Sequence, residues 1–149
     1  MKPYYQLITN HSDHTPGDCF RTCIACLLEI PPEQIPHVYE TTKDSIEGIK
    51  HLNIFLKPKH LQYFEFDFQC DDFEDLKNFL TSYQKIFTTE FWFIITGMTN
   101  SEQDLAHCIL VNQYGNIHNP LESDKNLSVQ PIKLENSFPI YSIGILAHI

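Results

Sequence analysis

The spacing of apolar residues differs between the two halves of this chain of 149 residues, and that difference constrains the fold. In the first half, apart from residues 62–70, apolar residues recur at the helical intervals of three and four. After Phe87 the apolar runs are short and strand-like, at residues 91–96, 107–111, 116–119, 129–134 and 140–146. Helices followed by strands predict an α+β fold. At this length we expect one domain that spans residues 1–149.

The first predicted helix carries three of the five cysteines. It begins at Cys19, after the turn formed by Pro16, Gly17 and Asp18, because aspartate is a favoured N-cap residue. Two consecutive prolines at positions 31 and 32 end it. Its core-facing stripe is predicted to contain Phe20, Cys23, Ile24, Leu27 and Leu28.

Two further helices are predicted from acidic N-terminal residues. One begins at about Asp44, with Glu47 completing a capping box, and the other begins near Asp71, with Glu74 three residues on. Their predicted apolar stripes are Ile46, Ile49, Leu52 and Leu56 in the first, and Phe73, Leu76, Leu80 and Tyr83 in the second.

Residues 62–70, QYFEFDFQC, alternate between aromatic and polar side chains with a period of two, which predicts a strand. We expect Phe64, Phe66 and Phe68 on the core face, and Glu65 and Asp67 on the solvated face. Residues 97–104 and 120–126 are the predicted loops. Cys70 and Cys108, which alternate with other residues in strands, are predicted to be core residues.

Composition narrows the classes of partner. The formal charge of −9, with no basic run interleaved with aromatics, argues against nucleic acid. No apolar window is long enough for a membrane span or a signal peptide, so we expect a cytoplasmic protein with reduced thiols. Delivery into another cell without a cleaved signal stays open. Oligomeric state is not determined by the sequence.

The three clustered cysteines allow several interpretations. Their spacing, CxxxCxxC, also occurs in enzymes that bind a four-iron cluster, but such ligands occupy an irregular loop rather than a periodic helix. Cys23 and Cys26 are therefore interpreted as small buried hydrophobic residues. Cys19 differs because the N-terminus of a helix favours a thiolate, which makes it a candidate nucleophile.

The segment AHCILVNQYGNIHNP predicts a β-hairpin that can supply the base. With Gln113, Tyr114 and Gly115 as the loop, Val111 faces Ile117, and His107 and Asn119 lie on one face as diagonal neighbours. A two-residue loop of Gly115 and Asn116 would instead place His118 on the face of His107. We prefer the first register because it pairs apolar residues across the strands.

A helix-N-terminal cysteine, a strand histidine and an amide form the constellation of a thiol hydrolase. His107 would accept the proton of Cys19, and the side-chain oxygen of Asn119 would orient the imidazole. The Cys19 backbone N–H would be the first oxyanion donor. A second donor is not identified; Asn10, Asp13 and His14 lie in the preceding loop, and none is the glutamine often found there.

The stretches GDCFRTCIACLLEIPPEQIP and AHCILVNQYGNIHNP resemble a group of small bacterial and phage proteins with a papain-like cysteine peptidase fold, related in layout to bacteriocin-processing peptidases. The resemblance implies a Cys19–His107–Asn119 triad, with the cysteine on a helix that packs against an antiparallel sheet. Two features depart from the group: Asn119 stands where most members have aspartate, and the predicted helix at residues 71–83 is an insertion.

The leading hypothesis is a thiol hydrolase that cleaves an amide, isopeptide or thioester bond in a protein or peptide, with no cofactor and no metal. Acyl transfer or glutamine deamidation would use the same three residues. The alternatives are a non-catalytic module that binds peptides on the same fold, and a protein that binds a metal or cluster through its cysteines. His118 is a rival base, and His11, Asp13 and His14 are a weak candidate zinc site.

Overall fold

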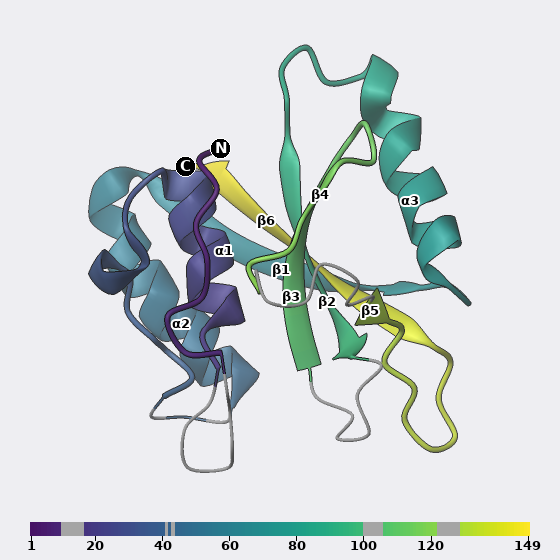
Figure 1. Cartoon of the computed structure of the whole chain (residues 1–149), viewed down its shortest axis with the longest axis horizontal. Helices are drawn as coiled ribbons and strands as arrows, with labels where there is room; N and C mark the ends of the chain where they lie inside the picture. The colour runs from purple at the N-terminus through teal and green to yellow at the C-terminus, as the bar shows by residue number, and fades with distance from the viewer. Residues whose placement is uncertain (10–16, 41, 43, 100–105, 122–128) are drawn as a thin grey trace.

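The computed structural model describes residues 1–9, 17–40, 42, 44–99, 106–121 and 129–149 (Figure 1). Within these residues an antiparallel sheet of six strands has the order β1-β6-β2-β3-β4, with β5 paired to β2. The bounds are α1 Cys19–Leu28, α2 Ser45–Leu56, β1 Leu61–Gln69, α3 Phe73–Thr81, β2 Trp92–Thr99, β3 Ala106–Asn112, β4 Ile117–His118, β5 Val129–Gln130 and β6 Ile140–His148. Short 3-10 helices follow at η1 Pro32–Gln34, η2 Lys57–Lys59 and η3 Ser82–Lys85.

The helices cover the two faces of the sheet, which confirms the predicted α+β class (Figure 1). Helices α1 and α2 lie on one face and α3 on the other. Alternation along β2 and β3 divides the core accordingly: Ile94 and Leu110 point toward α1, and Ile95 and Ile109 point toward α3. The sheet therefore has a buried centre on both sides.

Helix α1 begins at Cys19, as predicted, but it ends before the prolines. Glu29 adopts the left-handed conformation, with φ 59°, and its N–H bonds the carbonyls of Ala25 and Cys26. This αL cap ends the helix at Leu28. Two of the three cysteines, Cys23 and Cys26, are fully buried as predicted.

Helices α2 and α3 correct the sequence prediction in detail. Asp44 caps α2 by accepting hydrogen bonds from the N–H groups of Ile46 and Glu47, but Ile46 is 77% exposed rather than part of the core stripe. Helix α3 begins at Phe73, two residues after the predicted start, with Asp72 as its N-cap. Tyr83 falls in η3, because the α-helix ends at Thr81.

Strand β1 has the predicted bounds to within a residue, yet two of the three phenylalanines predicted for its core face are exposed, and only Phe68 packs on the core. Phe64 and Phe66 are 45% and 40% exposed, whereas Tyr63 on the opposite face is buried. The reason is the placement of the helices: Asn53 of α2 bonds both backbone groups of Tyr63, at 2.7 and 2.9 Å. Helix α3 covers only the far end of β1, where Phe68 stacks on Phe79.

The remaining strands lie close to their predicted positions. β2 continues to Thr99, so residues 97–99 belong to a strand and not to the predicted loop. β4 and β5 have only two residues each, shorter than predicted, and an isolated bridge joins Ile132 to Ile140.

The β3–β4 hairpin adopts the preferred register. Val111 pairs with Ile117, and Gly115 has φ +81° at the end of a turn closed by its N–H on the Asn112 carbonyl, at 3.0 Å. The Asn112 N–H in turn donates to the Asn116 carbonyl, at 3.0 Å. This is the predicted three-residue loop with glycine in the left-handed position.

Candidate active site

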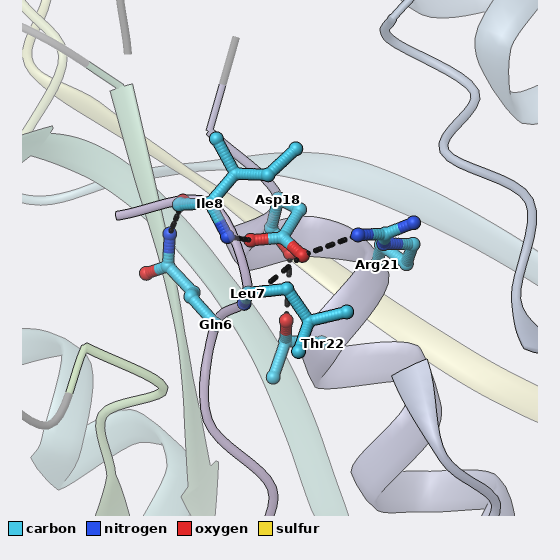
Figure 2. A network of polar contacts seen from close by, with 6 residues as sticks. All are labelled: Gln6, Leu7, Ile8, Asp18, Arg21 and Thr22. Atoms are coloured by element: carbon cyan, nitrogen blue, oxygen red, sulfur yellow. Dashed lines mark hydrogen bonds and ion pairs between the residues drawn. The ribbon is translucent and has the colours of Figure 1, made fainter. Parts of the chain in front are cut away.

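Cys19 is the first residue of α1, and the residue before it is held by a buried network (Figure 2). The Asp18 carboxylate is fully buried and accepts hydrogen bonds from the N–H of Leu7, at 3.3 Å, and of Ile8, at 3.0 Å. It also pairs with Arg21 at 2.6 Å. The N-terminal segment is thereby attached to the start of α1.

Asp18 occupies the predicted N-cap position but does not cap the helix with its side chain. The carboxylate bonds the N-terminal segment instead, and the Asp18 backbone carbonyl accepts hydrogen bonds from both the N–H and the hydroxyl of Thr22. The first-turn N–H groups of α1 therefore donate no hydrogen bond to the Asp18 side chain. They keep their capacity to stabilise a thiolate or an oxyanion.

On the hairpin, His107 and Asn119 form a direct hydrogen bond. His107 Nε2 lies 2.8 Å from Asn119 Oδ1. The Leu121 N–H donates to the same Asn119 atom at 3.0 Å, so that atom must be the amide oxygen. An amide oxygen only accepts, and the proton on the imidazole must therefore lie on Nε2. Nδ1 is left to exchange a proton with another group.

Cys19 contacts two adjacent residues of β3, His107 and Cys108. The pKa of its thiol is held well below the usual value by a hydrogen bond from the side chain of Cys108 and, next, by the hydrogen bond and positive charge of His107. The backbone N–H of Cys108 contributes in the same direction, while burial opposes the shift. The geometry thus brings Cys19, His107 and Asn119 together in the order expected of a nucleophile, a base and an orienting group.

Cys108, which the sequence predicted only as a core residue, lies against the Cys19 thiol. It is buried, as predicted, and the pKa of its thiol is raised well above the usual value, first by its hydrogen bond to Cys19 and then by burial. Thr96 Oγ1 lies 3.1 Å from Cys108 Sγ. The Thr96 contact lowers the pKa of the Cys108 thiol, as expected if the Thr96 hydroxyl is the donor. The sequence carried no signal for this contact, because neighbouring residues of a strand point to opposite faces and Cys108 pairs with a residue distant in the chain.

The other predicted candidates lie elsewhere. His118 Nε2 bonds the Tyr4 carbonyl at 2.9 Å, and its ring packs against Tyr5, so the rival base lies in a separate contact with the N-terminal segment. Burial raises the pKa of Cys23, and raises that of Cys26 to about 11. These two thiols are therefore poor nucleophiles.

Cys70, predicted as core, is only partly buried. Asn10, His11, Asp13 and His14 lie outside the described residues, and with them the candidate zinc site and the loop that precedes Cys19. Among the side chains that the structure describes, no group of three or more His, Cys, Asp or Glu residues could hold a metal ion.

No helix in the described part of the chain has the length and apolar character needed to cross a membrane.

Comparison of the sequence with models of known protein families and with curated proteins finds no match.

Proposed function

We propose that this protein is a small thiol hydrolase with a papain-like fold, in which Cys19 is the nucleophile, His107 the general acid and base, and Asn119 the group that orients the imidazole. The observation that carries the proposal is the contact chain from the Cys19 sulfur through His107 to Asn119. An α+β architecture with the nucleophile at a helix start and the base on an antiparallel sheet also supports it.

The contacts suggest how the reaction would proceed. The Cys19 thiolate attacks the carbonyl carbon of the substrate, and the oxyanion accepts a hydrogen bond from the Cys19 N–H. Protonated His107 gives its Nδ1 proton to the leaving amine or thiol, which yields an acyl-enzyme on the sulfur. His107 then takes a proton from water, and the hydroxide attacks the acyl group and releases Cys19.

The proposed substrates are amide, isopeptide or thioester bonds in proteins or peptides. An amine that replaces water in the second step would give acyl transfer, and a glutamine side chain as the acyl donor would give deamidation. All three outcomes require the same acyl-enzyme on Cys19. Trapping partners with a Cys19→Ser variant, whose acyl ester is hydrolysed slowly, would identify the acyl donor.

The test of the proposed site is competition among the five thiols for iodoacetamide at mildly acidic pH, followed by peptide mapping. We expect Cys19 to react first, and His107→Ala to slow its labelling by roughly tenfold or more. His118→Ala is the matched control, because that ring contacts Tyr4 instead. Equal labelling of all thiols in the folded protein would contradict the proposal and favour a non-catalytic binding module.

A further inference from the structure

The proposed hydrolytic mechanism uses only the sulfur of Cys19, yet a second sulfur, that of Cys108, lies in contact with it. Cys108 donates its thiol proton to the Cys19 sulfur, and its backbone N–H bonds the same atom. Cys19 belongs to α1 and Cys108 to β3, and both side chains pack in the core between these elements. Neither cysteine is in a disulfide.

A thiolate in hydrogen-bond contact with a thiol has a defined oxidation chemistry. Hydrogen peroxide transfers one oxygen atom to the thiolate, which gives a sulfenic acid and, after protonation, water. The neighbouring thiol then attacks the sulfenic sulfur, so that an S–S bond forms, the S–O bond breaks and a second water leaves. The two electrons that leave the protein sulfurs reduce one peroxide.

We propose that Cys19 and Cys108 form a reversible intramolecular disulfide when hydrogen peroxide oxidises Cys19. The proposal rests on the same Cys19 thiolate as the proposed function, although it does not require that the protein hydrolyse anything. Two molecules of a small thiol such as glutathione restore both protein thiols and become one disulfide.

The geometry selects Cys108 over Cys23 as the resolving thiol. Cys23 lies four residues after Cys19 in α1, and Cβ atoms at that spacing are about 5–6 Å apart. A disulfide needs Cβ atoms about 3.5–4.5 Å apart, so a Cys19–Cys23 bond would require unwinding the helix. Cys108 approaches from another element and already contacts the Cys19 sulfur.

The disulfide would protect the nucleophile from irreversible oxidation. A sulfenic acid that meets no thiol is oxidised further to a sulfinic acid, which small thiols do not reduce. Cys108 intercepts the sulfenic acid before a second peroxide arrives. The bond would also remove the free thiolate, so thiol reactivity would stop during oxidation and return on reduction.

The experiment treats the whole protein with hydrogen peroxide, without substrate, and measures intact mass and disulfide-linked peptides. We expect a loss of two hydrogen atoms, a linked pair of peptides containing Cys19 and Cys108, and full reversal by glutathione. In Cys108→Ser we expect Cys19 to gain two oxygen atoms instead, roughly tenfold faster than in the wild type. Cys23→Ala is the matched control and should form the disulfide normally.

The wild-type peptide map alone decides the proposal, even if a Cys108 variant fails to fold. A Cys19–Cys23 link, or sulfinic acid on wild-type Cys19 with no linked peptide, would overturn it. Failure of the proposed function is distinguishable: a protein that forms this disulfide but hydrolyses no acyl substrate contradicts only the hydrolase, and an active hydrolase that forms no disulfide contradicts only this inference.

Discussion

His107 Nε2 and Asn119 Oδ1 lie 2.8 Å apart across the β3–β4 hairpin, and the Leu121 N–H bonds the same oxygen. The oxygen therefore holds the imidazole with its proton on Nε2 and its lone pair on Nδ1. This relationship fixes the tautomer that a proton acceptor for Cys19 requires.

Removing the Asn119 oxygen should slow the alkylation of the Cys19 thiol without abolishing it. We expect Asn119→Ala to lower the iodoacetamide rate at Cys19 by about tenfold, because the imidazole loses its orientation but keeps its basicity. Asn119→Asp keeps an acceptor for both N–H groups and should lose less. Rates measured by peptide mapping distinguish the two variants; an equal loss in both would mean that hydrogen-bond acceptance is not the role of this residue.

The pH dependence of alkylation should separate Cys19 from the other thiols. Hydrogen bonds from Cys108 and His107 lower the pKa of Cys19, so its thiolate should persist to lower pH than that of an ordinary cysteine. The pKa values of Cys26 and Cys70 are raised to about 11, so these residues should react only at strongly alkaline pH. Thiolate ultraviolet absorbance against pH provides the measurement. A single transition near the ordinary value of 9.0 would contradict the shift.

Cys108 should contribute to the acidity of Cys19 as a hydrogen-bond donor. Cys108→Ala removes that donor and should move the Cys19 titration to higher pH, whereas Cys108→Ser keeps a donor and should move it less. Thr96→Val should shift it in the same direction by a smaller amount, since Thr96 acts through Cys108. If the Cys19 thiol titrates at the same pH in Cys108→Ala and in Cys23→Ala, the contact between Cys108 and Cys19 has no electrostatic role.

The buried Asp18 carboxylate should be important for stability. Asp18→Ala leaves Arg21 and two backbone N–H groups without their acceptor, and we expect a loss of about 2–4 kcal/mol in the free energy of unfolding. Urea denaturation measures it. Asp67→Ala, at an exposed position on β1, is the control and should change stability by less than about 0.5 kcal/mol. A similarly small effect of Asp18→Ala would contradict the prediction that the hydrogen bonds of this carboxylate stabilise the fold.

Two glycines should respond differently to alanine. Gly97 pairs with His107, and a Cβ there would lie 2.4 Å from the Gln130 carbonyl oxygen, so Gly97→Ala should cost about 1–3 kcal/mol. Gly115→Ala meets only ordinary contacts, and its cost of about 1–2 kcal/mol comes from φ +81°. Gly115→Asn should recover part of that loss, because asparagine tolerates this conformation; equal losses in the two Gly115 variants would argue against backbone strain.

Local sequence patterns predicted the helices, strands and hairpin of this protein, because the residues that determine each of these elements lie close together in the chain. The Pro-Gly-Asp turn marked the start of α1 at Cys19, and Gly115 determined the hairpin register that brings Asn119 to His107. The hairpin register depends on the backbone freedom of Gly115, whereas α1 begins at Cys19 even though the Asp18 carboxylate binds the N-terminal segment instead of capping the helix.

Sequence patterns failed where the outcome depended on which element packs on which face. The exposure of Phe64 and Phe66 follows from α2 covering the Tyr63 side of β1, and no pattern within β1 indicates that choice. Two other contacts also join segments that are distant in the chain. Cys108 donates a hydrogen bond to Cys19, and the N–H groups of Leu7 and Ile8 donate to the Asp18 carboxylate. Such contacts depend on tertiary arrangement.

The strand order also has a consequence for synthesis on the ribosome. β6, the last strand of the chain, lies between β1 and β2 and pairs with both. Until residues 140–148 leave the exit tunnel, the first strand has no partner among the described strands, and its edge that pairs with β6 stays open. A nascent chain at that stage would be most dependent on chaperones, and a truncation before Ile140 should aggregate rather than fold.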